Sequence, residues 1–165
     1  MFGFLKKKKD IEDNEFTLVS AISGKSIPLS EVPDPVFAQK MAGDGIAIDS
    51  TGDVIVAPAD GELTLVFNTK HAFAITLDNG IELLVHIGLD TVSLKGVGFE
   101  QLVEQGSRVK AGTPIIKINR DLIVSKNISL ITPILITNPD ITKNINVIEN
   151  IETIAGETVV INYSK

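Results

Sequence analysis

Short runs of apolar or alternating residues, each ended by glycine, proline, asparagine or aspartate, extend from Phe16 to Tyr163. Such runs predict β-strands, because successive side chains of a strand point to opposite faces of a sheet. Their spacing of about 8–12 residues is typical of an antiparallel sandwich or barrel. The pattern therefore predicts an all-β fold. The expected strands cover residues 45–49, 53–58, 61–67, 71–77, 81–87, 114–118, 133–137 and 158–162.

Two segments depart from the strand pattern. Residues 36–41 follow Pro35, and proline suits the first position of a helix, so one helical turn is expected there. Residues 99–105 are a second helical candidate, with Gly106 in the position that follows a helix C-terminus. The stretch 127–154 is rich in asparagine and isoleucine and is too apolar for a linker, so it is expected to form further strands.

The length and composition narrow the class of protein. A chain of 165 residues suits one domain, which we expect at residues 16–165. The formal net charge of −6 and the absence of tryptophan argue against a partner that is a nucleic acid. Cysteine is absent, which excludes thiolate nucleophiles and thiolate metal ligands. No apolar run reaches the roughly 18 residues of a membrane span, and we expect a cytoplasmic protein.

Residues 1–15 have the composition of a flexible N-terminal tail. Phe2, Phe4 and Leu5 form an apolar tip, four lysines follow, and an acidic stretch completes the segment. The order of apolar and basic residues is the reverse of that in a signal peptide. The alternative interpretation is a weak membrane-surface contact, in which the apolar tip enters the interface and the lysines meet anionic lipid.

The only two histidines of the chain flank the strongest hairpin signal in it. Two strand-like runs meet at Asn79-Gly80, which predicts a two-residue turn. Asp78 then lies opposite Ile81, and the register places His71 and His86 on one face as diagonal neighbours, about 7–8 Å apart at Cα. A slip of one residue would send one histidine to the other face.

A pair of imidazoles suits phosphoryl transfer. Neutral histidine offers a lone pair on one ring nitrogen, and a hydrogen bond from the other nitrogen fixes which one is free. A second imidazole can donate a hydrogen bond to the moving phosphoryl group. Two other interpretations remain at this stage: structural histidines, or a zinc site that Asp90 or a carboxylate from a partner would have to complete.

Two segments, 56–61 and 103–112, resemble the half-motifs of lipoyl and biotinyl carrier domains. A carrier of that kind needs a lysine at a hairpin tip, and Lys40 beside Met41 is the nearest candidate, in the wrong context. A zinc endopeptidase on a related fold would need a further pair of histidines, which the sequence lacks. Both alternatives are weaker than phosphoryl transfer, for which we expect no cofactor.

The segment 79–96 closely resembles the active-site segment of the glucose-type IIA component of the bacterial phosphoenolpyruvate-dependent sugar phosphotransferase system. The likeness covers nearly everything from Phe16 onward. It implies an antiparallel β-sandwich related to the barrel-sandwich hybrid (duplicated hybrid motif) folds, which fits the two half-motifs. The other matching segments are 32–38, 43–48, 56–61 and 106–112.

The same resemblance implies unequal roles for the two histidines. His86 matches the residue that accepts a phosphoryl group through Nε2 from the histidine-containing phosphocarrier protein and donates it to a cysteine on the IIB domain of a sugar permease. His71 matches the supporting histidine, and Thr69 matches its hydrogen-bonding neighbour. Asp34 and Asp90 match acidic residues at the rim, which would attract arginines of both partners.

The resemblance also implies an exposed apolar ring around the site, to which partners dock. Unphosphorylated members of the family can also bind and regulate other proteins, sometimes sharing a zinc ion, which here would bind at His71 and His86. We expect the chain itself to be a monomer. The apolar ring comprises Phe37, Met41, Phe67, Leu84 and Val92.

Overall fold

The computed structural model describes residues 15–165. The predicted tail and its membrane contact lie outside this range, except for Glu15, which already belongs to the first strand. Of the described residues, no helix is long and apolar enough to cross a membrane.

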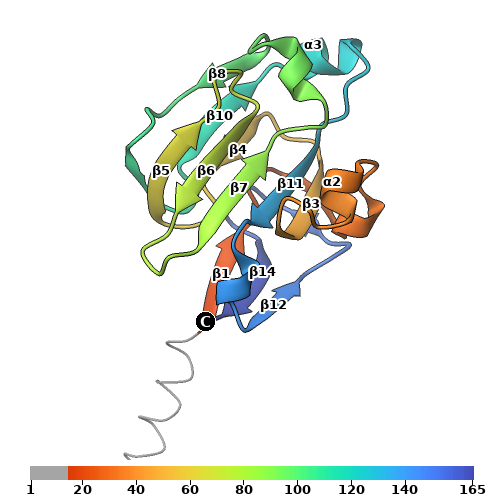
Figure 1. The fold of residues 1–165 in the computed structure, drawn as a ribbon. Coiled ribbons are helices and arrows are strands. Elements are labelled where there is room, and N and C mark those ends of the chain that lie inside the picture. Colours follow the sequence, from red (N-terminus) through yellow and green to blue (C-terminus); the bar gives the residue numbers. More distant parts are fainter. Residues whose placement is uncertain (1–14) are drawn as a thin grey trace, which may run out of the picture.

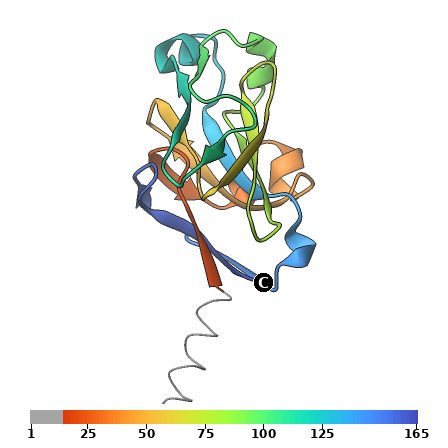
Figure 2. The same cartoon turned by 90° about the vertical axis from the view of Figure 1, so that its left-hand side faces the viewer.

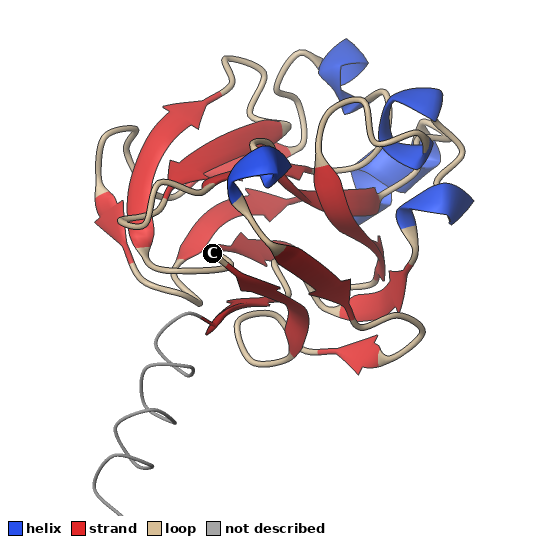
Figure 3. Cartoon of the chain, turned by 60° about the horizontal axis from the view of Figure 1, so that its bottom comes forward, coloured by secondary structure: helices blue, strands red, loops and turns tan. Residues whose placement is uncertain are grey.

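Strands make up the body of the molecule, and the helical segments are short (Figure 3). The strands are β1 (Glu15–Val19), β2 (Gly24–Ile27), β3 (Asp44–Ser50), β4 (Val54–Val56), β5 (Gly61–Val66), β6 (Ala72–Thr76), β7 (Glu82–His86), β8 (Phe99–Gln101), β9 (Arg108–Val109), β10 (Pro114–Ile118), β11 (Ile131–Ile136), β12 (Asn144–Val147), β13 (Glu152–Thr153) and β14 (Val159–Ser164). The helical segments are η1 (Leu29–Glu31), α2 (Pro35–Ala38), η2 (Thr91–Leu94), α3 (Arg120–Ser125) and η3 (Pro139–Ile141).

The strands form three antiparallel sheets. The largest has eight strands in the order β13-β2-β3-β11-β7-β6-β5-β9, and the other two are β4-β10-β8 and β1-β14-β12. Figures 1 and 2 show β1 and β14 side by side at the bottom of the molecule, where Glu15 pairs with Ser164. Residues of all three sheets share one apolar core, among them Leu18, Ile55 and Phe73. The prediction of an all-β antiparallel sandwich is confirmed.

The two half-motifs recognised in the sequence lie against each other. Gly61 pairs with Val109 where β5 meets β9, and the Gly112 N–H donates to the carbonyl of Ala57 over 2.8 Å. The Ala57 N–H in turn donates to the carbonyl of Thr113 over 2.9 Å. Segments 48 residues apart or more in the sequence are therefore paired through the main chain, as expected for a duplicated hybrid motif.

Alternation along β7 directs His86 away from the main core. Leu83 and Val85 face that core, whereas Leu84 and His86 are half-buried and face the opposite side of the large sheet. A second apolar group, the outer cluster, covers this side beneath η1 and α2, and Leu84 packs against it. The outer cluster comprises Leu29, Val32, Phe37, Ala47, Leu89 and Leu135.

The hairpin between β6 and β7 differs from the predicted one by one residue. Ala72, not Phe73, lies opposite His86, and Leu77 bonds to Ile81 across a three-residue loop. The Gly80 N–H closes a turn onto the Leu77 carbonyl, and only Gly80 of the Asn-Gly pair has positive φ, at 90°. A two-residue turn of the expected kind needs positive φ at both positions, so the sequence pair here forms a turn followed by a glycine bulge instead.

Of the two expected helices, one is confirmed and one is wrong. Helix α2 begins at Pro35, with Asp34 as its N-cap. Residues 99–101 form β8 instead of a helix, because they pair with β10 and bury Phe99 in the core. Gly106 lies in a turn before β9. Helix α3, which was not predicted, begins after Asn119, whose side chain accepts a hydrogen bond from the Leu122 N–H.

Candidate active site

His86 ends β7 with its ring on the outer face of the large sheet. Its Nδ1 lies 2.7 Å from the carbonyl oxygen of Gly88. A carbonyl oxygen can only accept a hydrogen bond, so Nδ1 carries the proton, and the neutral ring has its lone pair on Nε2. The main chain therefore selects which nitrogen of His86 is nucleophilic.

The turn after His86 depends on Gly88. Its φ is 79°, and a Cβ at this position would lie 2.6 Å from the Ser129 carbonyl and 2.6 Å from the methyl of Thr91. Any larger residue would displace the carbonyl that holds His86. Neither Gly88 nor the buried Thr91 was singled out from the sequence. The His-Ile-Gly order could have indicated Gly88, because a glycine directly after a strand often marks such a turn.

His71 reaches His86 by a route that strand alternation does not predict. In the observed register, position 71 would face the opposite side from His86 if β6 extended to it. His71 instead lies in the turn before β6. The preceding residue of this turn, Lys70, has a left-handed conformation with a φ of 58°. The turn redirects the side chain, and the two ring centroids lie 5.0 Å apart, edge to face at 79°. The expected proximity is present although the register behind the expectation was wrong.

Thr69 holds His71 from the same turn. Its hydroxyl oxygen lies 2.5 Å from Nδ1 of His71. His71 is 5% exposed, and its main-chain carbonyl accepts a 2.7 Å hydrogen bond from the N–H of Ile87, which follows His86. The structure therefore brings together Thr69, His71 and His86, the three residues that the sequence assigned to transfer chemistry.

Aromatic side chains back both imidazoles. The Phe37 ring lies 5.0 Å from His86, and the Phe67 ring lies 5.3 Å from His71. Phe37 is only 5% exposed and belongs to the outer cluster, so the expectation that it forms part of an exposed ring is wrong. The first turn of α2 places Phe37 between the helix and the sheet, where its ring packs against the ring of His86.

The remaining apolar residues expected at the rim differ in exposure. Met41 is 70% exposed and Val92 is 54% exposed, whereas Phe67 and Leu84 are half-buried. Val36, at 44%, is an exposed apolar residue on α2 that was not singled out. Exposed apolar groups of this kind suit contact with another protein.

Both histidines are neutral near pH 7. Burial lowers the pKa of His71, and a positive charge on His86 lowers it further. Burial also lowers the pKa of His86, although the Gly88 carbonyl and the carboxylates of Asp34 and Asp90 act in the opposite direction. The ordinary pKa of histidine is already about 6.5, so each ring keeps one N–H and one lone pair.

The two acidic residues approach His86 from different elements. Asp34 is fixed by capping α2, where its carboxylate accepts a 3.0 Å hydrogen bond from the Val36 N–H. Asp90 lies in the left-handed turn after Gly88, with a φ of 59°, and is exposed. Both carboxylates lie near enough to His86 to favour a positive charge on its ring.

Other chemistries find less support. Among residues 15–165, no group of three or more histidine, cysteine or acidic side chains is arranged to hold a metal ion. A tetrahedral zinc site at the two histidines would need ligands from elsewhere. Lys40 follows α2 and pairs with Asp44 over 3.3 Å, so it does not stand at a hairpin tip as a lipoyl or biotinyl carrier lysine would.

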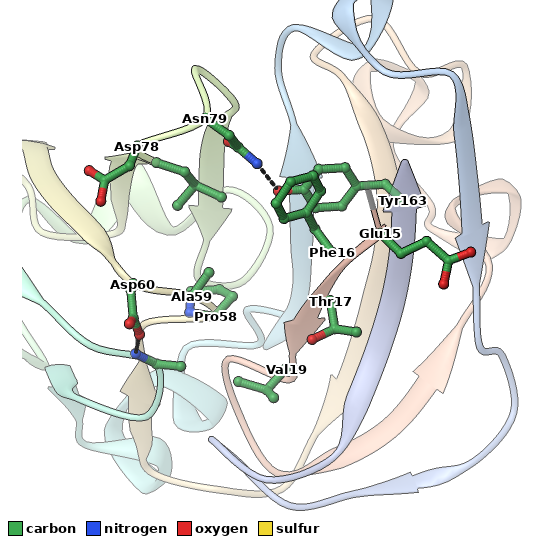
Figure 4. Close-up of a pocket in the computed structure, with 12 residues that line it drawn as sticks. Glu15, Phe16, Thr17, Val19, Pro58, Ala59, Asp60, Asp78, Asn79 and Tyr163 are labelled. Carbon is green, nitrogen blue, oxygen red and sulfur yellow. Dashed lines mark hydrogen bonds between the residues drawn. The ribbon is translucent and has the colours of Figure 1, made fainter. Parts of the chain in front are cut away.

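A cavity of about 500 Å³ lies beside the tip of the β6–β7 hairpin, where Asp78 and Asn79 line it (Figure 4). It opens between β1, the turn before β5 and the loop after β6, and no histidine lines it. Phe16 stacks on Tyr163 there, at 5.2 Å between ring centroids, and the Tyr163 hydroxyl accepts a hydrogen bond from Asn79. This cavity is therefore separate from the two imidazoles.

Comparisons with known proteins indicate one family. Residues 16–142 match the family described as "phosphoenolpyruvate-dependent sugar phosphotransferase system, EIIA 1". The chain is 45% identical over 161 residues to a PTS system glucose-specific EIIA component of Oceanobacillus iheyensis, covering 98% of each. A protein of the same name from Bacillus cereus is 47% identical over 147 residues, covering 89% of each.

A solved structure resembles the fold closely. It is the glucose permease IIA from Mycoplasma capricolum, which superposes with a TM-score of 0.83 at 38% sequence identity. The match covers 90% of this chain and 95% of that one. Sequence and fold therefore point to the same group of proteins.

Proposed function

The chain belongs to the EIIA 1 family of the phosphoenolpyruvate-dependent sugar phosphotransferase system, and we propose that His86 is the residue on which it carries the phosphoryl group. The family consists of phosphotransfer proteins that serve sugar uptake. One observation carries the proposal: Nδ1 of His86 is bonded to the Gly88 carbonyl at 2.7 Å, which leaves the Nε2 lone pair free beside a second imidazole.

The proposed reaction has two transfers. The Nε2 lone pair of His86 attacks the phosphorus of a phosphohistidine on the histidine-containing phosphocarrier protein, and that donor nitrogen leaves with its bonding pair. A cysteine thiolate on the IIB domain of a sugar permease then attacks the same phosphorus, and Nε2 recovers its lone pair. Positioning and charge stabilisation are the main tasks of the protein in such a loose transition state.

His71 supports the phosphoryl group in this proposal without carrying it. When the Thr69 hydroxyl donates to Nδ1 of His71, the ring proton lies on Nε2 and can be donated to a phosphoryl oxygen. The 5.0 Å between the ring centroids suits such a contact. A neutral donor stabilises the moving charge without binding the phosphoryl group as tightly as a cation would.

The rim residues serve partner recognition. Asp34 and Asp90 repel the phosphoryl dianion, which keeps the transfer potential high, and attract cationic side chains on both partners. Met41, Val92 and the half-buried Phe67 and Leu84 offer apolar contact area, with Phe37 packed beneath. One face thus serves the donor and the acceptor in turn.

The setting follows from the same proposal. Relatives that are 45% and 47% identical to this chain are named glucose-specific, and on that ground we place this chain in glucose uptake. It acts as a cytoplasmic monomer, and the permease selects the sugar. In its unphosphorylated state the same face binds other proteins for regulation, and a zinc ion at His71 and His86 would then take its remaining ligands from the partner.

The decisive experiment is to incubate the purified chain with phosphoenolpyruvate and the two upstream phosphotransfer components, and to locate the label by mass spectrometry. We expect a single phosphoryl group on His86. The proposal is wrong if the label appears on His71, or if no label appears while the upstream phosphocarrier protein itself becomes labelled.

A further inference from the structure

The peptide units on either side of Ile87 connect the two histidines. The Ile87 N–H donates to the carbonyl of His71 over 2.7 Å. The next peptide carries the Ile87 carbonyl and the nitrogen of Gly88, and Gly88 provides the carbonyl that holds Nδ1 of His86. The tilt of this short stretch of main chain therefore sets the position of both rings at once.

The side chain of Thr91 contacts both Ile87 and Gly88 in this stretch. Its hydroxyl donates to the Ile87 carbonyl over 2.6 Å, and the residue is fully buried. Its methyl lies against Gly88, where an added Cβ would come within 2.6 Å of it. Each branch of one threonine thus meets a different residue of the turn that follows His86.

The chain between His86 and Thr91 is shaped to allow this contact. Gly88 and Asp90 both have positive φ, at 79° and 59°, and they turn the main chain back so that Thr91 lies under Ile87. Ser93 secures the turn from the other side, because its hydroxyl donates to the Asp90 carbonyl over 2.7 Å. Left-handed conformations at residues other than glycine cost free energy, and they persist where the surrounding contacts compensate for them.

We propose that Thr91 is a positioning residue for phosphoryl transfer, which acts by fixing the Ile87 carbonyl so that Gly88 holds His86 and Ile87 holds His71. The proposal rests on His86 as the phosphoryl carrier. Thr91 itself touches neither the phosphoryl group nor a partner. Without its hydroxyl, the Ile87 carbonyl has no donor from η2, the peptide can tilt, and the bond that selects Nε2 of His86 as the nucleophile is weakened.

Two pairs of variants separate the hydroxyl from the methyl. Thr91→Val keeps the shape and removes the hydroxyl, whereas Thr91→Ser keeps the hydroxyl and removes the methyl. Thr91→Ala compared with Thr91→Ser differs only in the hydroxyl, and this pair gives the answer if the valine variant does not fold. Thr153→Val is the matched control, because Thr153 is also buried and also donates to main-chain carbonyls, but in β13 at the far end of the large sheet.

Two measurements are made on each variant. Imidazole nitrogen NMR of the unphosphorylated protein reports how fully the proton of His86 resides on Nδ1, and quench-flow labelling reports the rate constant for transfer from the phosphocarrier protein. For Thr91→Val and Thr91→Ala we expect a shift of the His86 tautomer signals and about a 10-fold slower transfer, since small misplacements of a reacting group have large effects. Thr91→Ser and Thr153→Val should stay within about two-fold of the wild type.

The inference is overturned if removal of the hydroxyl leaves both the His86 tautomer and the transfer rate unchanged. It is also overturned if Thr153→Val slows transfer as much as Thr91→Val, because general loss of stability would then explain the effect. The NMR measurement needs no phosphoryl transfer. A wild-type protein that is never labelled on His86 would therefore refute the proposed function, while the tautomer signals would still decide whether Thr91 positions the ring.

Discussion

The two ends of the β6–β7 hairpin are held by the same kind of hydrogen bond, with different consequences. At the tip, Asn79 uses both ends of its amide: the oxygen accepts from the Ile81 N–H, and the nitrogen donates to the Tyr163 hydroxyl. At the base, each histidine uses Nδ1 for a structural bond and leaves Nε2 uncommitted. A side chain with all its polar atoms paired stabilises the fold, whereas one with a spare nitrogen is held in place and remains able to react.

The largest expected effect is on phosphoryl transfer, and it tests the histidine end of the hairpin. Replacing His86 by glutamine removes the free lone pair, since an amide nitrogen is not nucleophilic. We expect labelling from the phosphocarrier protein to fall below detection, even though His71 remains. Labelling of His86→Gln at the wild-type rate would contradict the proposal that His86, and not His71, carries the phosphoryl group.

The second effect separates the two histidines. His71→Gln retains an N–H donor but places it less accurately, so the variant should accept phosphate and pass it to the IIB cysteine about 100-fold more slowly. His71→Ala, with no donor, should be slower still. Single-turnover transfer to the isolated IIB domain measures this step. If His71→Gln donates as fast as the wild type, His71 has no role in the transfer.

The third effect tests the tip. Asn79→Ala removes two hydrogen bonds, so we expect the free energy of unfolding to fall by about 2 kcal/mol. Tyr163→Phe removes only one of them and should cost about half as much. Urea denaturation measures both. Transfer rates should not change in either variant, and a tip variant that loses activity while folded would show that the two ends are not independent.

The smallest expected effect is a pH dependence of stability that arises from the two histidines. Burial lowers the pKa of His71 and of His86 in the folded state, so the unfolded chain binds protons first as the pH falls below about 6.5. Stability should therefore decrease from this pH downward and level off below the folded pKa values. For each histidine the slope is at most about 1.4 kcal/mol per pH unit.

His71→Gln should flatten this part of the curve, and Asn79→Ala should shift it to lower stability without changing its slope. Unfolding curves in urea at closely spaced pH values measure both. A wild-type protein that becomes more stable as the pH falls below about 6.5 would show that the burial of the two rings does not control their protonation.

The sequence predicts the strands well and the geometry of the hairpin poorly. Alternation and turn residues locate β3, β5, β7 and β11 because burial on one or both faces dictates them. The turn type depends on the φ of Asn79, which its local sequence leaves open. In the folded chain the Asn79 side chain is bonded to the hydroxyl of Tyr163, which is 84 residues away, so part of its environment is not local. Residues 99–105 show the same limit, since pairing with β10 overrides their local preference.

The residues of the candidate site could be predicted from the sequence, but the contacts between separate elements could not. The residue types and the family likeness pointed to His71, His86 and Thr69, which the structure brings together. The burial of Phe37 and the place of Thr91 beneath Ile87 depend on how separate elements fold onto one another. Side chains that act through the main chain of a neighbour leave no characteristic pattern in the sequence.

The pairing of β1 with β14 has a consequence for how such a protein can be handled and joined to others. Glu15 lies opposite Ser164, and Asn79 at the hairpin tip contacts this end of the molecule through Tyr163. The histidines lie at the other end of the hairpin, roughly 15 Å away along five strand residues. A linker or an immobilising tag joined to β1 or to β14 would therefore be attached at the opposite end of the hairpin from the two imidazoles, and under the proposed function a tethered copy should still accept and donate the phosphoryl group.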